Sequence, residues 1–489
     1  MKNLTLFTLL FWLTTLALNG QAVYEDHRYV PVEDPLVKEK LSQWQDFKFG
    51  LLMHWGAYSQ WGIVESWSIC AEDEDWCRRP IDDYEAYKES YENLKKTFNP
   101  VGFNPDKWAD AAADAGMKYV VFTTKHHDGF CMFDTQYTDY KVTSEECPFH
   151  VNEKANITKE IFDSFRAEDF WVGAYFSKPD WHNNDYWWPN FATPDRNVNY
   201  DPEAYPGKWE SFVDFTHNQI MELMTDYGDV DILWLDGGWV AKKSPEVIQR
   251  AYERKLENNT SGFIGAQVIN QDIRMDELVK KAREKQPGLI VVDRAVHGPH
   301  QNYLTPENHV PEEPLPYPWE SCIISGGGWS YTPDATYMEG HEAIHMLIDI
   351  VVKGGNLLYN IAPGPDGRWQ EGAYDLLEDM GDWIEVNGDG IYGTRVLKPH
   401  KEGNIGMTQK DGKAYFIYMA EENDEKMPSE IAVKSHRPAQ NAEVKLLGDD
   451  RELQWEAQGD GFLVIIPEDL QENPPSEYAW TVQVSELDK

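Results

Sequence analysis

Between about residues 45 and 365, the chain alternates short apolar runs with segments whose apolar residues recur at helical spacing. This alternation predicts βα units around a parallel sheet. Several of the runs are apolar at successive positions, which is typical of strands buried on both faces. The runs that predict strands are Phe49–His54, Tyr119–Thr124, Trp171–Ser177, Val230–Leu235, Leu289–Asp293, Cys322–Ser325 and Asn356–Ile361.

The intervening segments carry the signals of amphipathic helices. Asn104, Pro105 and Asp106 supply an N-cap, a first-turn proline and a first-turn acid for one helix. Apolar residues at helical spacing over Met275–Ala282 and over Ile344–Val351 predict two more. Each of these helices has one apolar face to pack against the sheet.

Polar side chains that could carry chemistry follow the predicted strands directly. In a (β/α)₈ barrel the carboxyl ends of the strands surround one mouth, where the active site is built. The alternative is an open doubly wound sheet with a glycine-rich phosphate turn, but no G-x-G-x-x-G opens a helix here. We therefore expect a (β/α)₈-like barrel over residues 23–392. The strand-end residues are His54, His126, His127, Asp128, Asp180, Asp236 and Arg294.

The pattern changes after about Tyr392. Segments at Lys413–Met419, Glu443–Leu447 and Gly461–Ile466 alternate or run in β-branched and aromatic residues, and glycine-containing turns separate them. This pattern predicts a small antiparallel β-sandwich over residues 393–489. The segment contains no cluster of candidate catalytic groups.

The N-terminus has the layout of a secretory signal peptide. A charged start at Lys2 precedes an apolar run over Leu4–Leu18, and small residues follow as far as Ala22. A membrane anchor is the alternative, but the run is at the short end of what spans a bilayer. We expect residues 1–22 to be a signal peptide and the protein to be exported, either to a periplasm or into the medium.

The five cysteines are too few, and odd in number, for a disulfide framework in an exported chain. Cys70 and Cys77 are close enough in the sequence to pair across a loop. Cys131 and Cys322 lie in strand-like segments, so we expect them to be buried thiols.

Composition excludes two classes of protein, nucleic-acid-binding proteins and disordered chains. The 84 acidic and 44 basic side chains give a net charge of −40, which opposes nucleic-acid binding because such proteins need a basic face. The 41% hydrophobic content, with 20 Trp, 25 Tyr and 20 Phe, excludes a disordered chain.

Asp236 is the first candidate for chemistry. It ends an apolar strand between Trp234 and Trp239 and is followed by Gly237 and Gly238. Asp236 could simply cap a turn. It could also be a nucleophile or base in an aromatic pocket, where the glycines let a ligand approach the backbone. Tryptophan faces stack on the C–H side of sugar rings, so this setting favours a carbohydrate substrate.

Glu307 is the second candidate. Taken alone it is an ordinary loop acid after the Arg294 strand. Glycoside hydrolysis needs two carboxyl groups, one ionised to attack the sugar carbon and one protonated to assist the leaving oxygen. Asp236 and Glu307 together supply such a pair. Arg294 could pair with a carboxylate or a hydroxyl, or form a purely structural ion pair.

His126 and His127 raise the question of a metal site. Neighbouring residues on a strand point to opposite sides, and no H-x-H or H-E-x-x-H spacing accompanies them. We therefore expect no metal and no cofactor, and we expect these histidines, like His54, to hydrogen-bond sugar hydroxyls.

Five motifs in order, together with two late runs, resemble the α-L-fucosidases of glycoside hydrolase family 29. They cover the chain from about residue 45 to residue 394. The motifs are Phe49–Gly56, Lys125–Phe130, Leu233–Gly238, Trp319–Cys322 and Gly328–Tyr331, and the late runs are Lys353–Pro363 and Ile391–Thr394.

The resemblance implies a retaining mechanism on terminal α-L-fucosides. Asp236 occupies the position of the family's nucleophile in W-x-D-G. The run Val292–Arg294 followed by Thr305–Glu307 resembles the family's arginine and downstream acid/base glutamate, which assigns that role to Glu307. Glu320 is the competitor for this role.

The resemblance also implies a set of fucose contacts, with Trp329 against the sugar methyl group. Glu65 and Trp67 resemble a family pair that touches the sugar, although Ser66 separates them in this chain. The remaining implied ligands are His54, His126, His127, Tyr175, Trp234 and Arg294.

Two other functions stay open at this stage. One is a non-catalytic fucose-binding protein on the same barrel, and the other is a retaining glycosidase for a related sugar such as galactose. In each case the partner is a fucosylated or similar oligosaccharide or polysaccharide, with no nucleic acid and no membrane after signal removal. A homo-oligomer is an open alternative to a monomer.

Overall fold

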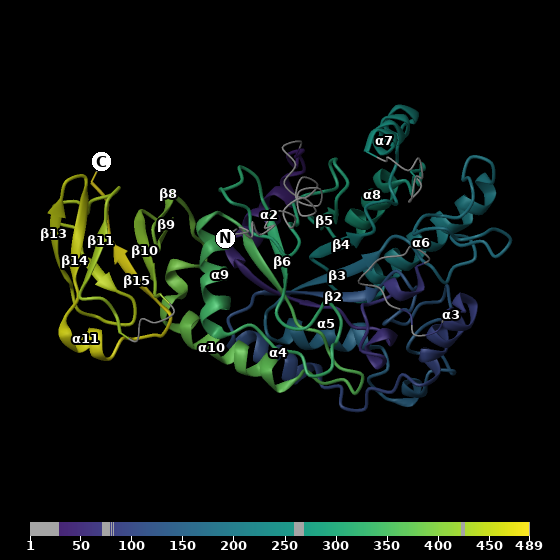
Figure 1. The fold of residues 1–489 in the computed structure, drawn as a ribbon, viewed down its shortest axis with the longest axis horizontal. Helices are drawn as coiled ribbons and strands as arrows, with labels where there is room; N and C mark the ends of the chain where they lie inside the picture. Colours follow the sequence, from purple (N-terminus) through teal and green to yellow (C-terminus); the bar gives the residue numbers. More distant parts are fainter. Residues whose placement is uncertain are drawn as a thin grey trace, which may run out of the picture.

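The computed structural model describes residues 29–70, 79, 81, 83–258, 268–421 and 426–488. The predicted signal peptide and Cys77 lie outside these residues. Cys131 and Cys322 are buried thiols, as the sequence predicts. Figure 1 shows a helix-wrapped sheet followed by a mainly β unit at the C-terminus.

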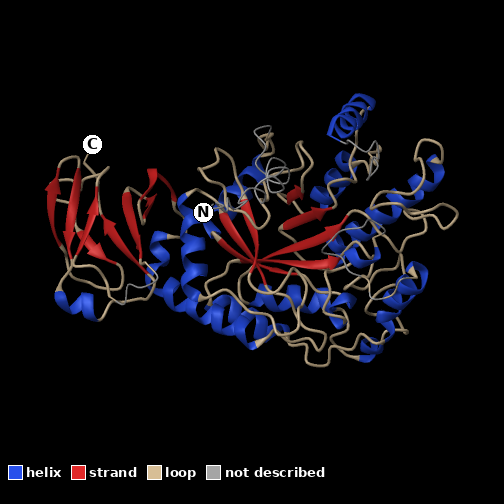
Figure 2. Cartoon of the chain, in the orientation of Figure 1, coloured by secondary structure: helices blue, strands red, loops and turns tan. Residues whose placement is uncertain are grey.

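The first unit is built on a seven-stranded parallel sheet with the order β5-β4-β3-β2-β1-β7-β6. All seven predicted strands are present, and the sheet curls as in a barrel (Figure 2). Most of the strand residues are buried, which matches their unbroken apolar runs. The strands are β1 Phe49–Met53, β2 Tyr119–Lys125, β3 Trp171–Ser177, β4 Ile232–Asp236, β5 Ile290–Asp293, β6 Glu320–Ile324 and β7 Asn356–Asn360.

An irregular segment over residues 301–308 closes the gap between β5 and β6. It forms an antiparallel bridge from Gln301 to β5 and a parallel bridge from Glu307 to β6, and Leu304 forms a parallel bridge to Trp319, just before β6. The Cys322 amide also donates to the carbonyl of Pro306 at 3.0 Å. We call residues 301–308 the closing segment. It stands in place of an eighth strand, because Pro306 has no N–H to donate to a regular ladder.

Helices cover the outside of the sheet (Figure 1). The three helices predicted from spacing are present as α4, α8 and α9, although the Asn104 side chain makes no capping hydrogen bond at the start of α4. Among the described residues, no helix is long and apolar enough to cross a membrane. The helices of this unit are α2 Pro35–Phe47, α3 Tyr84–Glu92, α4 Pro105–Asp114, α5 Ile157–Ala167, α6 Pro206–Asp226, α7 Pro245–Asn258, α8 Met275–Lys285, α9 Gly340–Val352 and α10 Glu371–Asn387.

Alternate strand residues fill the barrel interior. Trp44 on α2 stacks on Tyr303 of the closing segment with ring centroids 4.0 Å apart. Position 50 requires glycine, because a Cβ there would lie 2.4 Å from the Tyr119 ring. At the other end of the interior, Tyr175 stacks on Trp234 with centroids 5.2 Å apart. This packing fixes the positions of Tyr175 and Trp234, whose rings form the floor of the site described below.

The C-terminal unit is a sandwich of a five-stranded sheet, β12-β15-β10-β9-β8, on a three-stranded sheet, β11-β14-β13. Side chains from both sheets form one core, in which the Phe416 and Phe462 rings lie 5.3 Å apart. The three strands predicted here are present as β10, β12 and β14. The elements are β8 Arg395–Glu402, β9 Ile405–Lys410, β10 Lys413–Met419, β11 Glu430–Val433, β12 Val444–Leu446, β13 Gln454–Gln458, β14 Gly461–Ile465, α11 Glu468–Glu472 and β15 Ala479–Val484.

The sandwich packs on α9 and α10 of the barrel unit (Figure 1). The Trp383 indole donates to the carbonyl of Ala479 at 2.8 Å, and His345 contacts the carbonyl of Tyr478 at 3.0 Å. The predicted boundary between residues 392 and 393 stays a prediction.

Candidate active site

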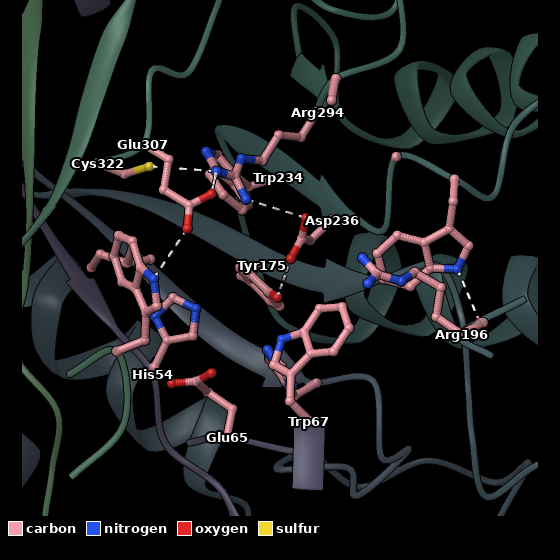
Figure 3. Close-up of a pocket in the computed structure, with 16 residues that line it drawn as sticks. His54, Glu65, Trp67, Tyr175, Arg196, Trp234, Asp236, Arg294, Glu307 and Cys322 are labelled. Carbon is pink, nitrogen blue, oxygen red and sulfur yellow. Dashed lines mark hydrogen bonds and ion pairs between the residues drawn. The ribbon is translucent and has the colours of Figure 1, made fainter. Parts of the chain in front are cut away.

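A cavity of about 390 Å³ opens among the carboxyl ends of the barrel strands (Figure 3). It brings together residues from several strands and from the closing segment. The sequence-predicted site residues that line it are His54, Glu65, Trp67, His126, Tyr175, Trp234, Asp236, Arg294, Glu307 and Trp329.

Asp236 is the last residue of β4, and its carboxylate is held on both oxygens. The Tyr175 hydroxyl donates to Oδ2 at 2.8 Å, and Arg294 Nη1 lies 3.4 Å from Oδ1. Burial alone raises the pKa of Asp236, but the charge of Arg294, the largest of several effects that favour the ionised form, helps to lower it to about 2. Asp236 is therefore an ionised carboxylate at neutral pH.

Glu307 reaches the cavity from the closing segment. Its Oε2 pairs with Arg294 Nη2, and its Oε1 accepts from the Trp329 indole at 3.2 Å. Arg294 thus binds both carboxylates through its two terminal nitrogens, as Figure 3 shows. One guanidinium that contacts two carboxylates holds them on the same side of the cavity.

Glu320, the competitor for the acid role, lies inside the barrel and does not line the cavity. Its carboxylate accepts from Tyr119 at 2.7 Å, from Trp234 at 3.3 Å and from Tyr303 at 3.4 Å. Burial raises the pKa of Glu320 to about 7. Trp234 lines the cavity, and its indole nitrogen donates to Glu320, which does not line the cavity. Glu320 therefore lies beneath the cavity floor.

His54 and His126 face the cavity as neutral rings. His54 Nδ1 lies 2.9 Å from the Asn360 amide oxygen, and His126 Nδ1 is bonded to the Ser66 hydroxyl. Burial lowers the pKa of His54 to about 4 and that of His126 well below its usual range. Each ring therefore has Nε2 left as the polar atom for a ligand.

His127 does not line the cavity. Its Nε2 lies 3.8 Å from Asp236 Oδ2, so it contacts the carboxylate and not the cavity space. The expectation that His126 and His127 point to opposite sides is wrong, because their ring centroids are only 4.3 Å apart. The strand β2 ends at Lys125, so the alternation of a strand does not extend to this pair.

These two histidines and Asp236 bring three potential metal-ligand atoms within 4.8 Å of one another. The Arg294 guanidinium, however, already lies 3.4 Å from Asp236, and Tyr175 donates to the carboxylate oxygen that faces His127. A divalent cation here would be repelled by the fixed arginine charge. The donors present fit a hydrogen-bonding site better than a metal site.

Glu65 and Trp67 both line the cavity although Ser66 separates them. Ser66 is fully buried and turns to His126, which leaves its two neighbours facing the cavity. Glu65 accepts from the Ser330 amide at 2.9 Å. Burial raises the pKa of Glu65 to about 8, so this carboxyl is protonated at neutral pH.

Arg196 lines the cavity, and no signal in the sequence marks it as a site residue. Its guanidinium lies 4.7 Å from the Trp67 ring and 5.4 Å from the Trp239 ring. Trp239 also lines the cavity. Its position three residues after Asp236 is the sequence signal that could have identified it as a site residue. Arg196 comes from the long connection between β3 and α6, where a strand-end pattern gives no guidance.

Comparison with known proteins places this site in a family. The sequence profile of the family described as alpha-L-fucosidase matches residues 16–389. An alpha-L-fucosidase of Branchiostoma floridae is 26% identical over 475 residues, covering 94% of this chain and 96% of that protein. The human plasma alpha-L-fucosidase is 26% identical over 485 residues, covering 94% and 93%.

Solved structures agree with the sequence comparison. Alpha-L-fucosidase isoenzyme 1 from Paenibacillus thiaminolyticus superposes with a TM-score of 0.71 at 28% identity, over 93% of this chain and 100% of that one. A Bacteroides thetaiotaomicron alpha-L-fucosidase of glycoside hydrolase family 29, described as a trapped covalent intermediate, has a TM-score of 0.68 at 21% identity, over 93% and 97%. The second structure shows the shared fold alone.

The barrel, the sandwich and the matches along most of the chain define a glycoside hydrolase. More specifically, the chain belongs to the alpha-L-fucosidase family, glycoside hydrolase family 29. The family resemblance stated from the five motifs is thereby confirmed.

Proposed function

We propose that this protein is an exo-acting, retaining α-L-fucosidase, with Asp236 as nucleophile and Glu307 as general acid/base. The observation that carries the proposal is the bridge formed by Arg294 between the two carboxylates. Retaining glycosidases need carboxyl groups only about 5–5.5 Å apart, whereas inverting enzymes leave room for a water. Two carboxylates on one guanidinium suit the short spacing.

The reaction proceeds in two displacements. Asp236 attacks the anomeric carbon while Glu307 gives its proton to the leaving oxygen, so that a fucosyl ester forms as the glycosidic bond breaks. Glu307, now ionised, then takes a proton from water, which attacks the same carbon and releases fucose and free Asp236. Arg294 and Tyr175 keep Asp236 ionised and oriented for the first step. The Bacteroides structure is described as a trapped covalent intermediate of that enzyme, the kind of species that this pathway contains.

The proposed sugar contacts follow from the lining of the cavity. His54, His126 and Glu65 supply hydrogen-bonding groups, and Trp67 and Trp234 supply aromatic faces. Trp329 presents apolar surface that suits the methyl group of fucose, and we assign it that contact. His127 acts on Asp236 and is assigned no direct sugar contact.

An assay of aryl glycosides tests the function. We expect release of the aryl group from the α-L-fucoside, with the product first formed as the α-anomer, and much slower release from the α- and β-D-galactosides. Loss of fucose specificity would favour the galactosidase alternative. Binding of fucose without any turnover would identify a non-catalytic fucose-binding protein.

We also propose that the protein is exported. The signal-peptide layout of the first 22 residues supports this. The name of the human relative, a plasma enzyme, is consistent with export.

The protonated state of Glu65 predicts an alkaline limit to activity. Because burial raises the pKa of Glu65 to about 8, raising the pH through this value ionises it. Ionisation removes the hydrogen-bond donor of the carboxyl group, and it places a negative charge near Asp236 and Glu307. We expect kcat/KM to fall by about tenfold per pH unit above this pKa.

The Glu65→Gln variant separates this effect from other acids of the site. Glutamine cannot ionise, so the decline near pH 8 should disappear from its pH profile. A decline that persists unchanged in Glu65→Gln would assign the limit to a different acid. The acidic side is not limited by Asp236 above about pH 3, since its pKa of about 2 keeps it ionised there.

A further inference from the structure

The neighbours of His54 fix the position of its proton. Asn360 Nδ2 donates to the carbonyl of Trp329 at 2.9 Å and to that of Gly328 at 3.3 Å. Carbonyls only accept, so this end of the amide must be the NH₂ group and the other end must be the oxygen. The oxygen lies 2.9 Å from His54 Nδ1, which must therefore carry a proton. In the neutral ring, Nε2 is then an acceptor.

The neighbours of His126 lead to the opposite result. Ser66 is fully buried, and within the described part of the chain the only hydrogen bond of its hydroxyl is to His126 Nδ1. If His126 Nδ1 carried the proton, the Ser66 hydroxyl would accept it and its own proton would be buried without an acceptor, which leaves the desolvation cost of that donor uncompensated. Ser66 therefore donates to Nδ1, and the proton of the neutral ring is on Nε2.

We propose that His54 and His126 present opposite hydrogen-bonding groups to the fucosyl ring, an acceptor at His54 Nε2 and a donor at His126 Nε2. Asn360 and Ser66 are the positioning residues that impose this difference. This inference rests on the proposed function for the identity of the ligand. The burial that keeps both rings neutral supports it, because an imidazolium would donate from both nitrogens.

The opposite polarity sets a rule for the substrate. The sugar hydroxyl that meets His54 must donate its proton, so O-methylation or O-sulfation at that hydroxyl removes the contact and puts an oxygen lone pair against a nitrogen lone pair. The hydroxyl that meets His126 needs only to accept. The natural substrate is therefore a terminal fucose that is unsubstituted at the position facing His54, including in glycans that are sulfated elsewhere.

Aryl fucosides with one hydroxyl replaced by hydrogen or by fluorine test this rule, because fluorine keeps a weak acceptor but has no proton to donate. At the position facing His54, fluorine should lower kcat/KM as much as hydrogen does, by about tenfold. At the position facing His126, fluorine should retain part of the activity that hydrogen loses. Two positions with the same fluorine tolerance would overturn the inference.

Ser66→Ala provides the second test, with Ser68→Ala as matched control. Ser68 is two residues away, is equally buried and has a hydroxyl with no hydrogen-bond partner among the described residues. We expect Ser66→Ala to raise KM about tenfold with a smaller change in kcat, Ser66→Thr to recover most of the loss, and Ser68→Ala to match the wild type. Equal losses in the two alanine variants would indicate a packing effect and overturn the role of Ser66.

Nitrogen-15 spectra of histidine-labelled protein read the tautomers directly, with His54→Gln and His126→Gln identifying the two signals. In the wild type, His54 should carry its proton on Nδ1 and His126 on Nε2, and Ser66→Ala should leave the His126 proton shared between both nitrogens. The same tautomer on both rings would overturn the inference. These spectra need no turnover. They therefore test the two tautomers even if the protein is not an α-L-fucosidase, and the aryl fucoside assay alone decides the proposed function.

Discussion

Replacing Asp236 by glycine is expected to lower kcat on an aryl α-L-fucoside by about 10³-fold or more, as removal of a nucleophile does in other covalent enzymes. The loss follows from its place at the end of β4, where Arg294 and Tyr175 hold an ionised carboxylate toward the cavity. Added azide should restore turnover in this variant, because the glycine leaves space for a small anion. The product should be fucosyl azide of inverted configuration.

Asp236→Asn is the matched control. The amide fills the space of the carboxylate but is a poor nucleophile, so this variant should lose activity equally and should not respond to azide. Rates measured with and without azide in both variants check the assignment. Unchanged activity in Asp236→Gly would remove Asp236 from the nucleophile role.

Replacing Glu307 by alanine is expected to have an effect that depends on the leaving group. A dinitrophenyl fucoside needs little protonation, so its kcat/KM, which reports the first displacement, should stay within about tenfold of the wild type. A fucosyl oligosaccharide needs its leaving oxygen protonated, and its kcat/KM should fall by about 10²–10⁴-fold. Steady-state rates on both substrates measure the difference.

Glu320→Gln is the control for this prediction. Glu320 lies beneath the floor, bound by three aromatic side chains, so its replacement should affect both substrates by the same factor. A selective loss on the oligosaccharide in Glu320→Gln, with none in Glu307→Ala, would transfer the acid role to Glu320.

The sequence predicts the regular part of the fold well, because it depends on local signals. Apolar runs locate all seven strands of the barrel sheet to within two residues, since strands buried on both faces are mostly apolar. In the sandwich, β8 and β13 are largely exposed or half-buried, and no apolar pattern marks them. The closing segment is equally hard to predict, because its pairing depends on β5 and β6 and not on its own propensity.

The candidate site divides in the same way. Residues at the end of a strand or directly after it, such as His54, Asp236 and Arg294, could be placed at the mouth from the barrel rule alone. The positions of Arg196 and His127 could not, because both depend on tertiary contacts of irregular segments. Ser66 shows the limit most clearly: the sequence suggests a disrupted pair, whereas the fold directs this side chain to His126.

The closing segment separates the two proposed catalytic groups mechanically. Asp236 belongs to a strand whose register is tied to both of its neighbours, so it cannot shift without disturbing the sheet. Glu307 belongs to a segment held by isolated bridges between connections that are free of regular structure. Insertions or deletions in residues 295–299 or 309–318 would therefore shift the Glu307 carboxyl relative to the leaving group of a bound substrate and leave Asp236 in place. The connections that flank the closing segment are thus where we expect the preference for one fucosyl linkage over another to diverge among related enzymes. The same connections are where we expect design to alter it.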